Sequence, residues 1–233
     1  MISSPPVIHP GALEHYVHAE SYETRYAARS EDVDYYLKLI SASARVLEYG
    51  AGAGRLTLRL AKKGSQVCAV DASSQMITLL RERLKTLPLS QKNNVVVKRA
   101  DMRTFRTNQR YDFVVAAFHT VGHLYSLRDI ESFLKRAYTH LAPGGRIVFD
   151  LPLPRIDMAE YDAIAGVRVT EMDGPHGPEL LTLRAYQPQE TAMHLYYAGF
   201  RKIRLTSDFS SAPVDTESSV FVVTAIKPHA HET

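Results

Sequence analysis

Short apolar runs alternate with amphipathic stretches over the middle of the chain. The runs are rich in valine and have the length of buried strands, whereas the stretches between them repeat apolar residues at helical spacing. Strands are expected at residues 45–49, 66–71, 94–99, 111–118 and 146–151. Helices are expected at residues 31–40, 56–63 and 126–141, and a further one opens at Asp71 and runs to Leu84. This alternation predicts an α/β fold around a parallel sheet.

The alternation stops after the fifth strand. Residues 167–172 and 180–186 are expected to form two strands around a turn rich in glycine and proline, as a hairpin-like insertion. A short helix at 189–198 and two strands at 200–205 and 220–226 follow. The last two strands would complete a sheet of seven.

Tyrosines and histidines gather near the N-terminus, behind an irregular lead-in rich in proline. Leu13, Tyr16, Tyr22 and Tyr26 fit one helical period. Two interpretations stay open: a helix that packs its tyrosines on the main domain, or a lid whose tyrosines and histidines face a substrate. We therefore divide the chain into an N-terminal helical lid segment, a main domain and a disordered tail. Their bounds are residues 1–30, 31–227 and 228–233.

The composition is that of an ordinary soluble globular chain. Of 233 residues, 45% are apolar and 23% are charged. The net charge is +3, and the lysines and arginines are scattered along the chain. No nucleic-acid groove is expected, because such a groove usually carries a dense basic stripe. The single cysteine, Cys68, excludes an internal disulfide framework and fits a reducing compartment. Without a membrane-length apolar run or a recognisable signal peptide, a cytoplasmic protein with no membrane partner is expected.

The segment between the first strand and its helix carries glycine at alternate positions. Gly50, Gly52 and Gly54 allow a tight turn and let a ligand approach main-chain N–H groups. The turn lies at the carboxyl end of a strand, where ligands bind in open α/β sheets. Arg55 stands where the dinucleotide fingerprint has its third glycine. A Glu48 carboxylate would repel a pyrophosphate but would suit the cationic amino group of an amino-acid-like ligand.

Two further carboxylates end the next two expected strands. Asp71 lies about twenty residues beyond Gly50, which is the spacing expected of a carboxylate that binds a ribose. One carboxylate can accept both hydrogen bonds of a vicinal diol. The alternative is that Asp71 only caps the following helix. With Asp101 after the third strand, acidic residues stand at three consecutive strand ends.

The glycine turn, the acidic strand ends and the Leu-x-Pro-Gly-Gly stretch at 141–145 resemble the class I S-adenosylmethionine (SAM) methyltransferases of the small-molecule branch. There is also similarity to azapteridine N-methyltransferases of the toxoflavin pathway. The resemblance covers roughly residues 32–227. It implies a seven-stranded, Rossmann-like, doubly wound sheet, mostly parallel with an antiparallel last strand and helices on both faces. SAM would be the cofactor and S-adenosylhomocysteine (SAH) the product, with no metal.

The same resemblance implies a set of cofactor contacts. The set comprises Tyr26, Arg29, Glu48, Gly50, Ala51, Gly52, Asp71, Ala72, Met76, Asp101, Met102 and Phe118. In it, Asp71 would bind the ribose and Asp101 the adenine amino group. Tyr26 and Arg29 would hold the carboxylate end of SAM, a role for which Arg25 competes.

Two histidines follow the fourth strand, whose end borders the transferred methyl group in this family. His119 is the candidate catalytic residue, as a proton acceptor or a hydrogen-bond partner of the substrate. A structural hydrogen bond is the alternative for each of His119 and His123. The two have metal-binding spacing, but no third ligand accompanies them, so no metal is expected. The region lacks the Asp/Asn-Pro-Pro-aromatic motif, a cysteine and an acidic cluster. This argues against adenine-N6, glutamine-N5, cytosine-C5 and Mg²⁺-dependent catechol enzymes.

Substrate contacts are expected from Tyr16, Tyr22 and His123. Together with Phe118 they would suit a flat, polar heteroaromatic ring. The preferred function is N-methylation, or O-methylation, of a small heteroaromatic metabolite in antibiotic or toxin biosynthesis, by a monomer or homodimer. A small amine, a carboxylate or a phosphonate is the alternative acceptor. Outside methyl transfer, one alternative is a catalytically silent subunit that binds SAM. The other is an NAD-type oxidoreductase, which Arg55 and Glu48 in the glycine turn disfavour.

Overall fold

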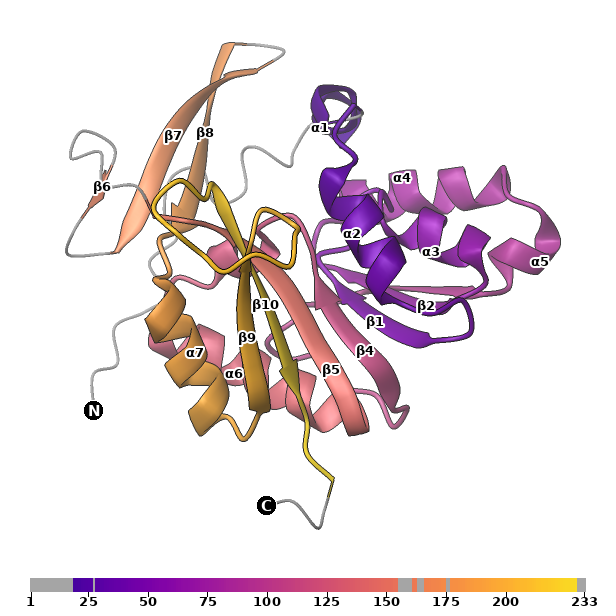
Figure 1. Cartoon of the computed structure of the whole chain (residues 1–233). Helices are drawn as coiled ribbons and strands as arrows, with labels where there is room; N and C mark the ends of the chain where they lie inside the picture. The colour runs from indigo at the N-terminus through magenta and orange to yellow at the C-terminus, as the bar shows by residue number, and fades with distance from the viewer. Residues whose placement is uncertain (1–18, 27, 155–160, 163–165, 175–176, 230–233) are drawn as a thin grey trace.

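The computed structural model describes residues 19–26, 28–154, 161–162, 166–174 and 177–229. Within these residues, seven strands form one sheet in the order β3-β2-β1-β4-β5-β10-β9 (Figure 1). They are β1 (Arg45–Tyr49), β2 (Gln66–Asp71), β3 (Val95–Arg99), β4 (Tyr111–Ala116), β5 (Leu141–Pro152), β9 (Arg201–Ser207) and β10 (Val220–Ile226). Strands β1 to β5 pair in parallel, and β10 is antiparallel to both of its neighbours. The predicted mostly parallel sheet with an antiparallel last strand is confirmed.

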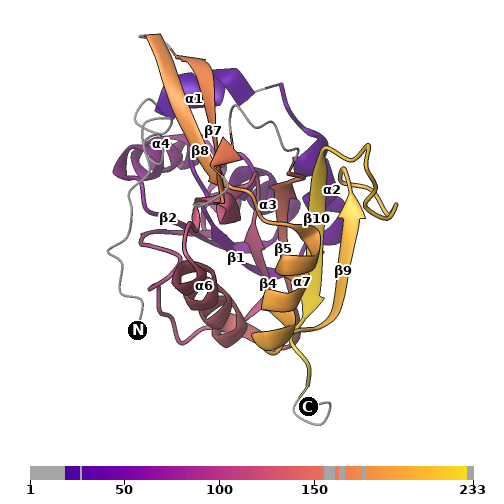
Figure 2. The same ribbon diagram turned by 90° about the vertical axis from the view of Figure 1, so that its left-hand side faces the viewer.

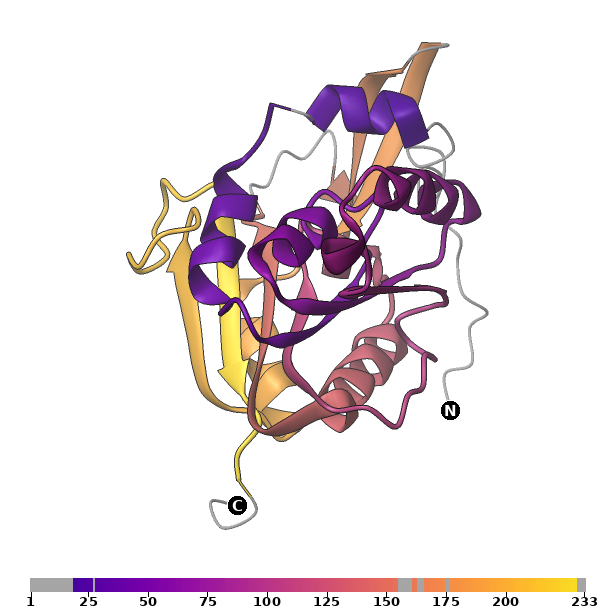
Figure 3. The same ribbon diagram turned by 90° about the vertical axis from the view of Figure 1, so that its right-hand side faces the viewer.

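Helices cover both faces of this sheet (Figures 1 and 3). One face carries α2 (Glu31–Leu39), α3 (Thr57–Lys63) and α4 (Ser74–Lys85), with the short α5 (Leu89–Lys92) beyond them, and the other carries α6 (Leu127–His140) and α7 (Pro188–Tyr197). Successive strand side chains point to opposite faces, so Val46 packs in the core under α3 while Leu47 packs in the core under α6. The doubly wound, Rossmann-like architecture is confirmed. None of these helices is long and apolar enough to cross a bilayer.

The Pro143–Gly145 stretch is a bulge in β5, where a turn ahead of the strand was predicted. Tyr111 pairs with Leu141 and Phe113 pairs with Arg146, so β5 carries three more residues than β4 over this interval. The chain beyond β10 supports the bulge, because Gly144 N–H donates to the Lys227 carbonyl and Lys227 N–H donates to the Gly145 carbonyl. The ring of His229 lies against Gly144. Of the expected tail, Pro228 is buried and His229 is exposed, and residues 230–233 lie outside the described part.

A second, three-stranded antiparallel sheet follows β5. It contains β6 (Tyr161–Asp162), β7 (Val167–Gly174) and β8 (Gly177–Arg184), so the expected hairpin is longer toward its tip and has a third strand. The N-terminal helix α1 (Ala19–Tyr26) lies over the same end of the main sheet as this hairpin (Figures 1 and 2). Tyr186, expected in the second hairpin strand, lies beyond β8, where its buried hydroxyl donates to the Leu124 carbonyl.

Candidate active site

The glycine turn after β1 combines two close approaches. Gly50 has a left-handed φ of 66°, and a Cβ there would overlap the side chain of Thr120. Gly54 faces α4 in the same way, because a Cβ would overlap Leu80. At Gly52, with φ 53°, the nearest side-chain atom to a Cβ would be the Met76 sulfur at 4.0 Å. Gly52 is thus the glycine of the turn whose main chain is least crowded by side chains.

Asp71, at the end of β2, is joined directly to this turn. One carboxylate oxygen accepts the Gly52 N–H at 2.8 Å, and the other accepts the Ser73 N–H at 2.8 Å. Burial raises the pKa of Asp71, and these backbone hydrogen bonds oppose that shift. The alternative role for Asp71 was to cap the following helix. The N-cap of α4 is instead Ser73, whose hydroxyl accepts the Met76 N–H. Each oxygen of Asp71 keeps a further lone pair for a ligand hydroxyl.

Glu48 is a buried carboxylate with one side-chain hydrogen bond. Its Oε2 accepts from the Thr57 hydroxyl at 2.5 Å, and the residue is 3% exposed. Burial raises the pKa of Glu48 to about 7, although the Thr57 hydrogen bond and the charge of Arg55 lower it. Among the described residues Glu48 has no ion pair. A nearby cation would therefore shift this group toward its ionised form.

Asp101, after β3, is held by Arg103, which was not among the predicted site residues. The Arg103 main-chain N–H and Nε donate to Asp101 Oδ1 at 2.8 and 2.9 Å, and Nη1 donates to Asp129 at 2.7 Å. Burial raises the pKa of Asp101, but the contacts with Arg103 outweigh it and leave the pKa below its usual range. Met102 packs at the edge of the core under α6. An adenine amino group at Asp101 would share the carboxylate with Arg103.

The end of β4 turns sharply at two residues with left-handed backbone. Phe118 and His119 have φ values of 57° and 62°, a conformation that costs a non-glycine residue on the order of 1–2 kcal/mol. Asp150 of β5 accepts both of their N–H groups, at 2.9 and 3.0 Å. It also accepts the Tyr36 hydroxyl at 2.7 Å and is fully buried. Burial raises the pKa of Asp150, but the contacts with His119 and Tyr36 outweigh it and lower the pKa.

Phe118 is the centre of a cluster that contains several of the predicted residues. The ring of Tyr26 lies 4.8 Å from it and that of Tyr22 lies 6.3 Å away, both edge-on. The guanidinium groups of Arg29 and Arg55 lie 5.0 and 4.6 Å from its centroid. The structure therefore brings Tyr22, Tyr26, Arg29 and Phe118 together, beside the glycine turn that carries Arg55.

Arg55 also connects this cluster to the start of α2. Its guanidinium makes a two-pronged ion pair with Asp32, which is fully buried, and donates to the Arg29 carbonyl at 3.1 Å. Arg55, which stands where the dinucleotide fingerprint has its third glycine, is thus held in a buried ion pair within the protein. This placement excludes a third close glycine contact with a ligand at that position.

Helix α1 bridges the glycine turn and the hairpin. Tyr22 packs on the buried pair Ala53 and Met76. On its other side, Arg25 donates to the Asp173 carbonyl and lies 3.9 Å from Glu179. Arg25, the competitor of Arg29, is therefore engaged by the hairpin.

The remaining predicted residues are placed as follows. His123 Nδ1 lies 3.2 Å from the Tyr125 hydroxyl, which donates to the Thr182 carbonyl of β8 at 2.8 Å. This chain of contacts ties the loop after β4 to the hairpin, which fits the structural alternative for His123. Ala51 is buried and Ala72 is exposed, and Tyr16 lies outside the described residues. No group of three potential metal ligands occurs within the described part of the chain.

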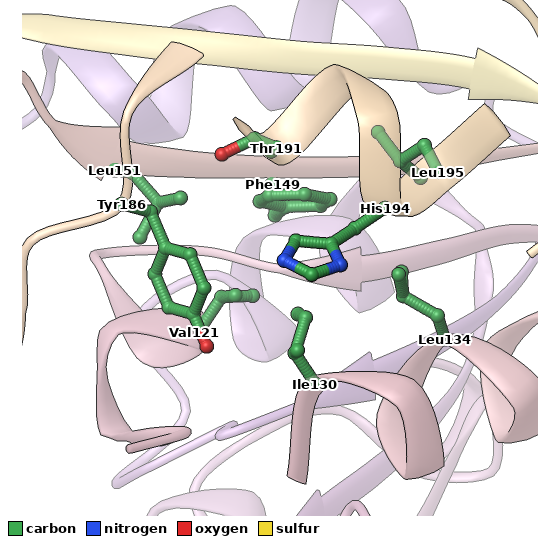
Figure 4. Close-up of a pocket in the computed structure, with 9 residues that line it drawn as sticks. All are labelled: Val121, Ile130, Leu134, Phe149, Leu151, Tyr186, Thr191, His194 and Leu195. Atoms are coloured by element: carbon green, nitrogen blue, oxygen red, sulfur yellow. The ribbon is translucent and has the colours of Figure 1, made fainter. Parts of the chain in front are cut away.

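A small apolar hollow elsewhere in the core is not a ligand site. It is lined from α6, α7 and β5, with residues such as Ile130, Phe149 and His194 converging on it (Figure 4). The space between them does not admit a water molecule. None of the predicted site residues lines this hollow.

Comparison with known proteins identifies a domain and a fold. A family model described as a methyltransferase domain matches residues 46–145. A dTDP-3-amino-3,4,6-trideoxy-alpha-D-glucopyranose N,N-dimethyltransferase from Streptomyces venezuelae is 26% identical over 141 residues, which cover 57% of this chain and 56% of that protein. The chain thus spans about half the length of this relative, and a putative methyltransferase from Bacillus subtilis is matched over a similar share, 48%.

Solved structures agree with this assignment. The CcbJ methyltransferase from Streptomyces caelestis has a TM-score of 0.74 at 23% identity, covering 86% of this chain and 90% of that chain. The glycopeptide N-methyltransferase MtfA in complex with SAM has a TM-score of 0.67 at 20% identity, covering 87% and 88%. Residues 46–145 therefore match a methyltransferase domain, and the chain has the fold of SAM-dependent methyltransferases.

Proposed function

We propose that this chain is a SAM-dependent methyltransferase that methylates a nitrogen of a small molecule. The observation that carries the proposal is the convergence of Glu48, Asp71 and Asp101 at the ends of three adjacent parallel strands, around a glycine turn. Each carboxylate matches one polar part of the cofactor. Glu48 would meet the ammonium group, Asp71 the ribose hydroxyls and Asp101 the adenine amino group.

The chemistry of these groups fits SAM better than a dinucleotide. A pyrophosphate would bring negative charge beside a buried Glu48, whereas an ammonium group would neutralise it. Asp71 is fixed by the Gly52 N–H and keeps acceptor capacity for a diol. Tyr26 and Arg29, beside Phe118, supply a hydroxyl and a cation for the carboxylate end. The residues proposed to contact SAM would thus follow one line from α1, past the end of β1, to the end of β3.

Bound SAM supplies a methyl group on a cationic sulfur, which departs as the thioether of SAH. The chain's own residues then have to align the acceptor and exclude water. Helix α1 and the β7–β8 hairpin, joined through Arg25, would provide that cover. His119, at the end of β4, would accept the proton that the acceptor nitrogen loses.

Two observations support a nitrogen acceptor and leave two kinds of small molecule to test. The relative from Streptomyces venezuelae is named for N,N-dimethylation of an amino sugar, and MtfA is named as a glycopeptide N-methyltransferase. The aromatic cluster of Tyr22, Tyr26 and Phe118 suits stacking on a flat ring instead. We favour a heteroaromatic nitrogen for this reason, with an amino sugar as the second candidate.

The test is methyl transfer from deuterated SAM to two acceptor panels, one of nitrogen heteroaromatics and one of nucleotide-linked amino sugars, read by mass spectrometry. A product that carries the labelled methyl group on nitrogen supports the proposal, and the panel that yields it decides the acceptor class. Labelled oxygen products would contradict the nitrogen assignment. SAH binding without turnover on any acceptor would favour the silent SAM-binding subunit.

A further inference from the structure

Asp150 occupies a position that neither its sequence context nor the cofactor explains. It is fully buried near the end of β5, yet it contacts α2 and the turn after β4. Its Oδ1 accepts from the Tyr36 hydroxyl and the Phe118 N–H, and its Oδ2 accepts from the His119 N–H. One carboxylate therefore satisfies both N–H groups of a left-handed pair of residues, which is a device for holding that pair in place.

The same carboxylate meets the ring of His119. Nδ1 of His119 lies 3.1 Å from Asp150 Oδ2 and is buried, while the side chain as a whole is 18% exposed. The approach is close, but it does not have the geometry of a hydrogen bond. Catalytic hydrogen bonds are often poorly aligned before the ligand binds and align in the complex. The ring of Phe118 is stacked with the imidazole, with centroids 5.5 Å apart and an interplanar angle of 19°.

We propose that Asp150 is a positioning residue that fixes His119 as the Nδ1–H tautomer and leaves Nε2 as the ring's proton acceptor. The proposal rests on the proposed methyltransferase function. An imidazole that donates from Nδ1 to a carboxylate carries its lone pair on Nε2. An acceptor nitrogen that carries a hydrogen, whether in an amine or in a heteroaromatic ring, must lose that proton for the methylated product to be neutral. That proton goes to Nε2, and the imidazolium that forms is stabilised by the buried carboxylate.

Two features separate this arrangement from a carboxylate that only supports the backbone turn. The carboxylate is acceptor-only when ionised, and every other polar contact around it is a donor. His119 is the one residue of the turn that contacts Asp150 through both main chain and side chain.

The first test is nitrogen-15 NMR of the histidine side chains in the whole protein, saturated with SAH at neutral pH. The His119 signals are those missing from the His119→Asn spectrum. The expected result is a neutral ring with the proton on Nδ1. A proton on Nε2, or a fully protonated ring, would overturn the proposal. If the protein does not bind SAH, the proposed function fails; if it binds SAH with the other tautomer, only this inference fails.

A second test uses kinetics with the acceptor identified by methyl transfer. Asp150→Asn is expected to lower kcat by about tenfold or more, since a positioned base contributes roughly that much or more, with the KM for SAM nearly unchanged. In the His119→Ala background the same substitution should cost clearly less in kcat, because only the contacts of Asp150 with the backbone turn and Tyr36 are then lost. An equal loss in both backgrounds would assign Asp150 to structure alone.

The matched control is Asp112→Asn, which removes an exposed carboxylate paired with Arg45 at the start of β4. It should leave kcat and the His119 tautomer as they are in the natural protein. If Asp150→Asn does not fold, the tautomer measured in the natural protein decides the question.

Discussion

The buried Glu48 carboxylate predicts that SAH binding depends on pH. With a pKa of about 7, set mainly by burial, Glu48 is about one-tenth ionised at pH ~6 and nine-tenths ionised at pH ~8. If the SAH ammonium group binds only the ionised form, and lowers the pKa of Glu48 in the complex, affinity follows that fraction. SAH should then bind about tenfold tighter at pH ~8 than at pH ~6, or about 1.4 kcal/mol.

Calorimetry measures this coupling in two independent ways. Titrations at several pH values give the change in affinity, and titrations in two buffers of different ionisation enthalpy give the protons released. About half a proton should leave per SAH bound near pH ~7, where the pKa lies. Affinity that does not change with pH, together with heats that do not depend on the buffer, would refute the pairing of Glu48 with the ammonium group. Glu48→Gln should remove the pH slope, and any slope that it keeps belongs to other groups such as Asp71.

The same shift predicts an opposite effect on stability. The pKa of Glu48 is raised on folding, so the folded protein binds this proton more tightly than the unfolded chain. Below the unfolded pKa both states are protonated and no cost arises. The cost grows as the pH rises toward 7 and reaches about 3 kcal/mol above it. Glu48→Gln should therefore raise the free energy of unfolding at alkaline pH while it weakens SAH, and a loss of stability there would contradict the burial argument.

Four further variants test other parts of the protein. Asp71→Ala should weaken SAH by about 1–3 kcal/mol, as charged hydrogen bonds contribute, and unchanged affinity in a folded variant would remove its ribose role. Arg55→Ala should lower the free energy of unfolding by about 3–5 kcal/mol, because Asp32 stays buried without its partner. Arg45→Ala, which breaks an exposed pair, should cost under about 1 kcal/mol, and denaturant titrations that gave equal losses would contradict this ranking. Deletion of residues 1–28 should spare the fold, judged by circular dichroism, and lower methyl transfer, whereas full activity would exclude a lid.

The architecture was predictable because each element follows from a local pattern. Alternating apolar runs and helical periods located β1, β2 and β10 to within a residue, and the glycine turn marked where ligands bind. The bulge in β5 was not predictable, since Pro143 to Gly145 are typical of a turn and only the pairing with the chain beyond β10 holds them in the sheet. Strand lengths in the hairpin also depend on pairing between strands.

The site was predictable where one residue and its strand end carry the chemistry, as for Asp71. It was not predictable where the contact joins distant segments. Asp150 of β5 contacts Tyr36 of α2 and His119 after β4, and nothing in their spacing in the sequence indicates these contacts. The available signal was a single acidic residue inside the apolar run of β5. Arg103 was missed for a different reason, because its pairing with Asp101 is local but uninformative in sequence.

The most direct test of the account is calorimetric titration of the whole protein with SAH, with NADH as the comparison ligand. The glycine turn with Glu48, Asp71 and Asp101 predicts micromolar binding of SAH, weakened in Asp71→Ala, and no binding of NADH. Binding of NADH without SAH would contradict the cofactor assignment and would return the turn to a dinucleotide site.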